Sequence, residues 1–347
     1  MARYPRDELT DFVSRLFAAA GMEPDKGRLV AEILIEADMM GHDTHGLQLC
    51  AAYLEDLQSG EMTAAGEPEV LSDKGAAVVW DGGWRSGVWL TASALDLACE
   101  RASELGMAAV AVRRSHHIAC LQAYLPRATE RGQVAMIVCS DPSGATVAPY
   151  GGLDAVFTPD PLAFGIPTDG DPILIDMSAS ITTNALSERL HESGGRYPGA
   201  WAIDAEGRPT DDPAVLFSEP KGTILPSGGA DHGHKGYGLA LLVESLSQGL
   251  SGYGRADKPD NWGASVFVQV FEPAAFMGLQ AFTGQSGWIA EACRAARPAP
   301  GVAAVRLPGQ KAMARRRRAL AEGVELVAGT LEEIAPWAER LGVPALG

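Results

Sequence analysis

The chain of 347 residues carries 44 acidic and 28 basic residues, a formal net charge of −16 at pH 7. This charge argues against binding to nucleic acids or to anionic membrane surfaces, because both attract basic proteins. With 46% hydrophobic and 21% charged residues, the composition is that of an ordinary globular protein rather than a disordered or fibrous one. At roughly 150 residues per domain, the length predicts two lobes or one large interwoven unit.

The cysteines are odd in number and widely spaced, at Cys50, Cys99, Cys120, Cys139 and Cys293. This pattern is typical of reduced thiols in a cytoplasm rather than of a disulfide framework. No stretch approaches the roughly 18 apolar residues of a membrane span, and the charged N-terminus has no apolar signal core. We therefore expect a cytoplasmic protein without a membrane partner.

The first part of the chain is predicted to be helical. Apolar residues repeat at helical spacing over 9–17, a second helix is expected over 25–40, and Gly41 ends it. The loop 41–46 then leads into a third helix through Leu54 and Leu57. Helices thus precede any strand in this prediction.

Alternating strands and helices begin near residue 76 and predict an α/β unit. The expected strands cover 77–80, 108–112 and 134–139, and the expected helices cover 86–105 and 118–130. Residues 144–180 show short strands and turns without room for helices, so a mixed sheet is predicted. A polar excursion over 188–229 with a hairpin at 204–207 follows, and then a helix over 236–249, a strand over 265–271, a helix from Pro273 and helices over 310–322 and 331–341.

Six of the seven histidines fall in three junctions that contain glycine or serine: His42, His45, His116, His117, His232 and His234. A single histidine is more often a surface or satisfied core residue. Six at junctions predict a shared pocket, and an unperturbed pKa of roughly 6.5 suits histidine to proton transfer near neutrality.

A dinucleotide enzyme of the doubly wound kind would show G-x-G-x-x-G after its first strand, and this chain has no such motif. The segment Gly233 to Gly238 instead places Lys235 and backbone amides at the start of an apolar helix, which suits a phosphate or carboxylate. The alternative is that these glycines only allow the helix start to pack tightly.

A metal site is not expected. His232 and His234, with His116, His117 and Cys120, could chelate a divalent ion, but no closed set of Cys and His spacing is present.

Three carboxylates, Asp141, Asp160 and Asp176, stand at the ends of apolar runs. Each alone is more often a turn former. Together they suggest partners that orient the histidines.

At these residues the chain resembles the malate/L-lactate dehydrogenase family of non-Rossmann oxidoreductases, which includes ureidoglycolate, L-sulfolactate and 2,3-diketo-gulonate dehydrogenases and reductases of piperideine-2-carboxylate. The match runs from about Leu9 to Gly342. Its pieces are Asp43–Gly46, Arg113–Ala119, Ser140–Pro142, Ala148–Gly152, Thr158–Phe164, Asp176–Ser180, Lys235–Leu239 and Pro308–Gln310.

The resemblance implies an enzyme that transfers a hydride between NAD or NADP and a 2-oxo or 2-hydroxy acid, or a related carbonyl or imine. It implies an α/β fold of the L-sulfolactate dehydrogenase kind, with a non-Rossmann mixed sheet flanked by helices. In that fold a helical part over 1–75 packs with 300–347, and a central part over 76–299 binds cofactor and substrate. The expected partners are a small-molecule substrate and a second copy of the chain, as a homodimer.

The resemblance also assigns residues. His117 matches the catalytic acid/base, and Thr44 and His45 match a pair that contacts substrate and nicotinamide. Asp141 is expected as their catalytic partner from its place at the end of an apolar run, not from the resemblance. The expected cofactor contacts are Ser140, Asp160, Leu174, Ile175, Asp176, His234, Lys235, Gly236, Asn261, Trp262 and Gly263, and the expected substrate contacts are Leu49, His116 and Arg113.

This chain departs from the family where substrate is held. Leu49 stands near the position at which relatives carry an arginine for the substrate carboxylate, and Asp160 and His116 stand where asparagine is common. The usual Gly-Lys after Asp176-Met177 is also absent. We expect a less acidic or larger substrate, or a role for Arg113 or Arg114 in its place. The alternative is a family member that has lost redox chemistry and serves as a binding protein or a non-redox acid/base enzyme.

Overall fold

The computed structural model describes residues 3–346. Its helices are α1 (Arg6–Ala19), α2 (Pro24–Met40), α3 (Cys50–Ser59), α4 (Gly87–Leu105), α5 (Pro126–Thr129), α6 (Asn184–Glu192), α7 (Gly229–His232), α8 (His234–Glu244), α9 (Leu279–Ala295), α10 (Gln310–Glu322) and α11 (Thr330–Leu341). Its strands are β1 (Arg3–Tyr4), β2 (Glu69–Asp73), β3 (Ala77–Asp81), β4 (Met107–Ser115), β5 (Val134–Ser140), β6 (Pro161–Ile166), β7 (Ile173–Ser178), β8 (Ala202–Ile203), β9 (Pro209–Thr210), β10 (Thr223–Ile224), β11 (Ala264–Phe271) and β12 (Val324–Glu325).

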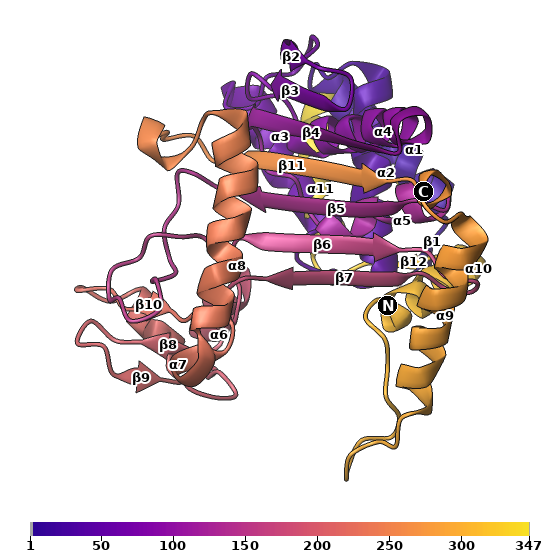
Figure 1. Cartoon of the computed structure of the whole chain (residues 1–347). Coiled ribbons are helices and arrows are strands. Elements are labelled where there is room, and N and C mark those ends of the chain that lie inside the picture. Colours follow the sequence, from indigo (N-terminus) through magenta and orange to yellow (C-terminus); the bar gives the residue numbers. More distant parts are fainter. Residues whose placement is uncertain (1–2, 347) are drawn as a thin grey trace.

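The central sheet is mixed, as predicted. Within the described residues, seven strands lie in the order β2-β3-β4-β11-β5-β6-β7 (Figure 1). β3 and β4 are parallel, and the other neighbouring pairs are antiparallel. β2 precedes residue 76 and pairs with β3, so the sheet begins inside the segment that the sequence assigned to the helical part.

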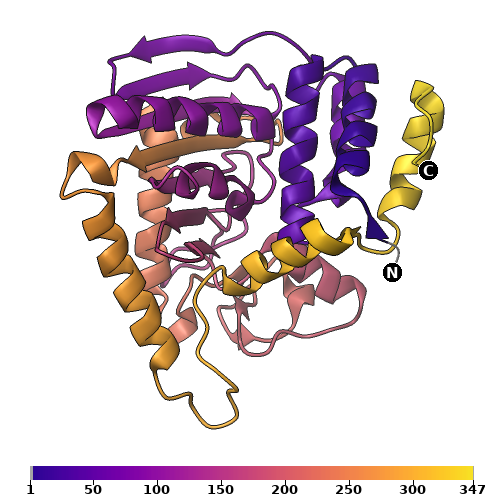
Figure 2. The same ribbon diagram turned by 90° about the vertical axis from the view of Figure 1, so that its right-hand side faces the viewer.

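The two faces of the sheet are covered unequally. α4 contacts β4 and β11, and α2 packs against α4, so this face lies over the main apolar core. On the opposite face, α8 and α9 stand near the two ends of the strands (Figures 1 and 2). None of the helices within residues 3–346 is long and apolar enough to cross a membrane.

The two ends of the chain lie together beside the N-terminal helices. β1 pairs antiparallel with β12, and α10 contacts α2. Figure 2 shows α10 and α11 next to these helices. The boundaries at residues 75 and 300 stay a prediction.

Proline, glycine and serine set the ends of α2 and α4, and Gly41 ends α2 as predicted. Pro24 opens α2, and Gly41 ends it with φ of 85°, a left-handed conformation that favours glycine. Ser86 caps α4 by accepting a hydrogen bond from the Trp89 amide.

Two predicted helices differ from the structure. The segment expected to be helical over 118–130 contains only a 3-10 turn, η2 (Leu121–Tyr124), and the short α5. Cys120 is extended there, with φ −84° and ψ 121°, so a continuous helix cannot form. The helix predicted over 236–249 ends at Glu244 and continues as a π turn, η4 (Ser245–Gly249). The predicted hairpin is confirmed by the pairing of β8 with β9.

Candidate functional site

The topology brings two predicted site segments together at one end of the sheet. Ser115 at the end of β4 pairs with Ala264 at the start of the antiparallel β11. His116 and His117, which follow β4, therefore lie beside Trp262, which precedes β11. The rings of His117 and Trp262 are stacked, with centroids 4.5 Å apart and an interplanar angle of 23°.

The loop after α2 adds the second predicted pair. The His45 ring centroid lies 5.9 Å from that of His117, and Thr44 Oγ1 lies 2.7 Å from His45 Nδ1. Asp38 in the last turn of α2 holds this loop, since its Oδ2 accepts a 2.8 Å hydrogen bond from the Leu47 amide. The structure thus brings the predicted Thr44, His45 and His117 together.

Tyr53 of α3 is a site residue that sequence reasoning missed. Its side chain is buried, and its hydroxyl lies 2.8 Å from His117 Nδ1. The Ala119 amide also points to Nδ1, at 3.4 Å, which leaves Nε2 as the nitrogen for proton transfer. Tyr53 belongs to the buried stripe of α3 with Cys50, Leu54 and Leu57, so from sequence it reads as core.

Burial keeps the histidines of the site neutral. It lowers the pKa of His45 to about 4, with a smaller effect from His42, and lowers the pKa of His116 to about 4. Burial, then His45 and His116, lower the pKa of His117 well below its ordinary value. Asp56 Oδ2 lies 3.2 Å from His116 Nε2. At pH 7 these imidazoles can therefore accept protons.

A second group of predicted residues meets the same loop through Gln122. His42 Nε2 lies 2.8 Å from Gln122 Oε1, and the Gln122 side chain donates to the Leu174 carbonyl. The backbone N–H of Gln122 donates to Asp176 Oδ2 at 2.9 Å. Gln122 was not predicted, because it lies in the segment read as an ordinary helix. Ile175, next to Asp176 in β7, pairs with Phe164 of β6.

Ser140 and Asp160 belong to a buried polar cluster at the end of β5. Ser140 Oγ donates to Glu244 Oε1 at 2.6 Å and accepts from Arg255 at 3.1 Å. Thr158 donates to Asp160 Oδ1 at 2.8 Å. Burial, and next the charge of Glu244, raise the pKa of Asp160 to about 7. Both predicted cofactor residues are fully buried in this arrangement.

The three predicted carboxylates do not hydrogen-bond to the histidines of the site within residues 3–346. Asp141 Oδ1 accepts from the Ser143 amide and hydroxyl at 2.9 and 2.7 Å, a turn contact. The partners found beside His117 and His116 are Tyr53 and Asp56 instead.

The predicted anion site at α8 differs from the structure in one respect, the backbone amide of Gly236. The Gly236 amide is not free, because it donates to the Ser227 carbonyl at 3.1 Å. A Cβ on Gly236 would lie 2.3 Å from the Ser227 nitrogen, so this glycine permits tight packing. The side chains of His234 and Lys235 are exposed, and the His234 ring lies 5.7 Å from that of Tyr150.

The other residues predicted to contact substrate or cofactor interact with residues of the chain itself. Arg113 and Arg114 both donate to Asp81, and Leu49 is half-buried against the main core. Asn261 donates to Glu61 at 2.8 Å. A Cβ on Gly263 would lie 2.4 Å from the Ser115 carbonyl oxygen, so this glycine lets β4 and β11 approach.

Comparison with known proteins agrees with this arrangement. A family model described as malate/L-lactate dehydrogenase matches residues 4–335. The malate dehydrogenase of Pyrococcus abyssi is 30% identical over 352 residues, which cover 99% of this chain and 96% of that protein. The Delta(1)-pyrroline-2-carboxylate/Delta(1)-piperideine-2-carboxylate reductase of Pseudomonas syringae pv. tomato is 30% identical over 342 residues, 95% of this chain and 94% of that protein.

The fold agrees as well. The crystal structure of malate dehydrogenase from Entamoeba histolytica matches with a TM-score of 0.91 and 26% identity, over 99% of both chains. Fold and site thus define an oxidoreductase of the dehydrogenase and reductase class, as predicted. The chain belongs to the malate/L-lactate dehydrogenase family. The alternative of a non-redox or binding protein is not favoured by these relatives.

Proposed function

We propose that this protein transfers a hydride between NAD or NADP and C2 of a 2-oxo or 2-hydroxy acid, or of a cyclic imine carboxylate. The observation that carries the proposal is the His117 imidazole, held at Nδ1 by Tyr53, stacked on Trp262 and next to His45. The names of the relatives, a malate dehydrogenase and a cyclic imine reductase, support both substrate types.

The residues around His117 fit a nicotinamide cofactor. Trp262 leaves 41% of its surface exposed beside His117 and offers a flat apolar face. The exposed Lys235 in the first turn of α8 offers a cation for phosphate. The nicotinamide supplies or accepts the hydride, and all other tasks fall to the chain. The remaining predicted contacts, including Asp176 and Asn261, stay part of the proposal.

His117 moves the proton. In the oxidation direction its neutral imidazole accepts the substrate hydroxyl proton at Nε2, in the tautomer whose Nδ1–H donates to the Tyr53 oxygen and gives up the long 3.4 Å contact with the Ala119 amide. In the reduction direction Nε2 returns the proton. Thr44 and His45 orient the substrate beside it. A positioned acid/base of this kind contributes roughly 10²- to 10⁴-fold to the rate.

The charges near the site favour a substrate of low charge or larger size. Arg113 and Arg114 are both paired with Asp81, and Leu49 occupies the position expected for a carboxylate-binding arginine. Without that guanidinium, a second carboxylate on the substrate loses a charge-assisted bond of about 1.5–3 kcal/mol. The substrate is then held by Thr44, His45 and His116.

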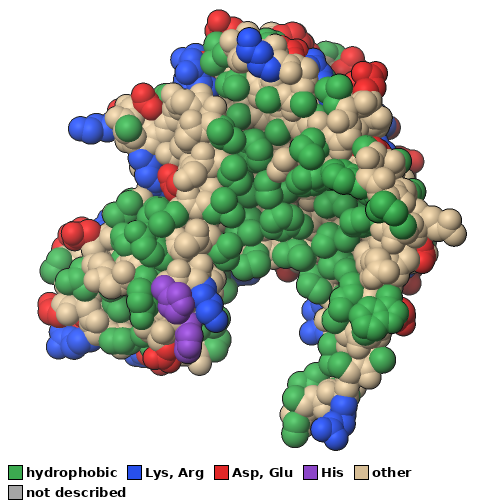
Figure 3. Space-filling model, viewed as in Figure 1, with side chains coloured by type: hydrophobic (Ala, Val, Ile, Leu, Met, Phe, Trp, Pro, Cys, Tyr) green, Lys and Arg blue, Asp and Glu red, His purple; other side chains and the backbone are tan. Residues whose placement is uncertain are grey.

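The apolar face of the sheet supports a homodimer. Leu241 and Leu242 of α8 and Trp288 and Ile289 of α9 expose between 45% and 67% of their surfaces. Figure 3 shows hydrophobic side chains gathered in the hollow between these two helices. A contiguous exposed apolar surface of this kind marks an interface. All five cysteines are free thiols, which supports a cytoplasmic location.

The test combines cofactor binding with turnover. NADH and NADPH fluorescence is measured on adding protein, and oxidation of each is then followed against 2-oxo acids and piperideine-2-carboxylate. We expect His117→Ala to lower kcat by roughly 10²- to 10⁴-fold with cofactor affinity nearly unchanged. Near-normal kcat in this variant would remove His117 from its proposed role, and no turnover by the wild-type protein with any member of the panel would reject the proposed reaction.

A further inference from the structure

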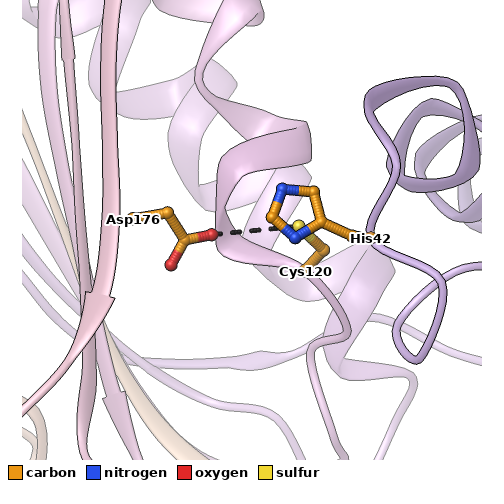
Figure 4. A group of neighbouring side chains, drawn as sticks. All are labelled: His42, Cys120 and Asp176. Atoms are coloured by element: carbon orange, nitrogen blue, oxygen red, sulfur yellow. Dashed lines mark hydrogen bonds between the residues drawn. The ribbon is translucent and has the colours of Figure 1, made fainter. Parts of the chain in front are cut away.

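Three metal-ligating side chains from distant parts of the chain meet beside the loop 41–46. His42 belongs to that loop, Cys120 precedes η2, and Asp176 belongs to β7. One ligand atom from each lies within 4.8 Å of the others. Figure 4 shows the side chains of Asp176 and His42 pointing toward one another, with the Cys120 thiol next to the imidazole and a dashed line joining the thiol to Asp176. Sequence spacing could not indicate this group, because the three residues share no local motif.

The donor set and its spacing suit a tetrahedral ion. Zinc is bound at about 2.3 Å by sulfur and about 2.0–2.2 Å by nitrogen and oxygen, which places its ligand atoms roughly 3.3–3.6 Å apart. Cys120 Sγ and Asp176 Oδ2 are 3.9 Å apart, so a small movement brings them to that distance. Three protein ligands leave the fourth position open for water, as in sites of the open type.

The charge balance also favours a divalent cation. A thiolate and a carboxylate together carry two negative charges, which a divalent cation cancels. The buried group is then neutral overall, and this removes the cost of burying a net charge. His42 and Asp176 are only half-buried, which leaves a path for the ion.

We propose that His42, Cys120 and Asp176 bind one divalent cation of the zinc class. Binding replaces the Cys120 thiol proton, which is released to solvent, and the His42 contact to Gln122 and the Gln122 contact to Asp176 rearrange around the ion. The ion then ties the loop 41–46 to η2 and β7. Asp176 is also a proposed cofactor contact, but the metal-binding test needs neither cofactor nor turnover, so this inference and the proposed reaction can fail separately.

The experiment uses Zn²⁺ and the spectroscopic probe Co²⁺ on the full chain. Equilibrium dialysis with metal analysis is expected to show one tightly bound Zn²⁺ per chain, and Co²⁺ is expected to give a thiolate-to-cobalt charge-transfer absorption that Zn²⁺ abolishes. Cys120→Ala is expected to lose this absorption and to weaken Zn²⁺ binding by more than the roughly 10- to 100-fold that outer contacts of a metal site contribute.

Two further variants separate the loss of a metal ligand from a general loss of folding. His42→Asn changes a half-exposed ligand and is expected to weaken binding as Cys120→Ala does. Cys293→Ser removes the half-exposed thiol of α9 and is expected to leave the absorption and the affinity unchanged. The proposal is overturned if the wild-type protein shows no thiolate-to-cobalt band, or if the band is lost in Cys293→Ser and kept in Cys120→Ala.

Discussion

The depressed pKa of His117 determines how its chemistry depends on pH. In the free protein the imidazole is neutral at pH 7, because burial and the neighbouring His45 and His116 disfavour its charged form. In the proposed reaction, the neutral ring is the base that oxidation needs. Protonation, which removes this base, begins only well below the ordinary histidine value of about 6.5.

We therefore expect kcat/KM for oxidation of the hydroxy substrate to stay level from pH 8 down through about pH 6.5, the ordinary histidine pKa, and to fall only at lower pH. For reduction, kcat/KM should instead rise as the pH falls, since the free enzyme must first gain a proton. The measurement is the pH profile of kcat/KM in both directions. An acid limb for oxidation centred at or above pH 6.5 contradicts the burial argument.

The hydroxyl of Tyr53 positions His117 and is expected to act through it. Tyr53→Phe removes the partner of Nδ1 and leaves the aromatic ring in the core. A hydrogen bond to a charged imidazolium contributes about 1.5–3 kcal/mol, so kcat should fall roughly 10- to 100-fold while cofactor affinity stays unchanged.

Tyr197→Phe is the matched control, because Tyr197 is buried and its hydroxyl has no hydrogen-bond partner among the described residues. It should leave kcat unchanged. Equal loss in both variants would show that Tyr53 acts on stability alone.

At the scale of elements, the start of α4 supports the histidine segment. A Cβ on Gly87 would lie 1.9 Å from the His116 carbonyl oxygen and 2.7 Å from that of His117. These are backbone atoms, so they cannot rotate away as a side chain would. The glycine therefore sets how closely α4 approaches the segment that holds His116 and His117.

Gly87→Ala is expected to destabilise the protein by about 1–3 kcal/mol through overpacking and to lower kcat, because His117 is displaced with its backbone. Urea unfolding and steady-state kinetics measure the two effects. Gly284→Ala in α9 is the control, since its Cβ would meet nothing within 4 Å, and it should be neutral or stabilising. An unchanged kcat in Gly87→Ala would show that the backbone of His116 and His117 can move away from the added methyl group without affecting catalysis.

Asp38 connects the end of α2 to the loop 41–46, and its contribution to the stability of the fold depends on pH. Burial raises its pKa to about 7, so the folded protein holds this proton more tightly than the unfolded chain does. Stability from this group is present below the unfolded pKa of about 3.8 and is lost as the pH rises through about 7.

Asp38→Asn removes this dependence and keeps an oxygen for the Leu47 amide. The variant should gain stability relative to the wild type as the pH rises from 4 to 8, by an amount on the order of 4 kcal/mol, since each unit of pKa difference corresponds to about 1.4 kcal/mol. Denaturant unfolding across this range measures it. If the free energies of unfolding of the two proteins changed with pH in parallel, Asp38 would not be the group that binds the proton.

At the scale of the whole molecule, the open face of the sheet predicts self-association. Trp288→Glu and Leu242→Glu place charges in the hollow between α8 and α9, and we expect them to convert a dimer into monomers in sedimentation experiments. Leu320→Glu, on an exposed site of α10, should leave the dimer intact. A wild-type protein that sediments as a monomer would refute the homodimer.

Much of the molecule follows from the sequence by itself. Helical periodicity, apolar runs and glycine punctuation predicted α1, α2, α4, the strands β3, β4, β5 and β11, and the C-terminal helices, because these are local signals. The short strands and turns of 144–180 predicted a mixed sheet, and the motifs that resemble a known family predicted the reaction class and the residues Thr44, His45 and His117 as a group.

Only the tertiary structure decided which partners these residues have. Tyr53 looks like a core residue of α3, and the contact with His117 exists only because α3 packs beside the end of β4. The same holds for the contact of Gln122 with Asp176 and for Arg113, which forms an ion pair with Asp81. Local pattern records which way a side chain faces on its own element, whereas hydrogen bonds and ion pairs between distant elements depend on strand order and helix packing, which no local pattern contains.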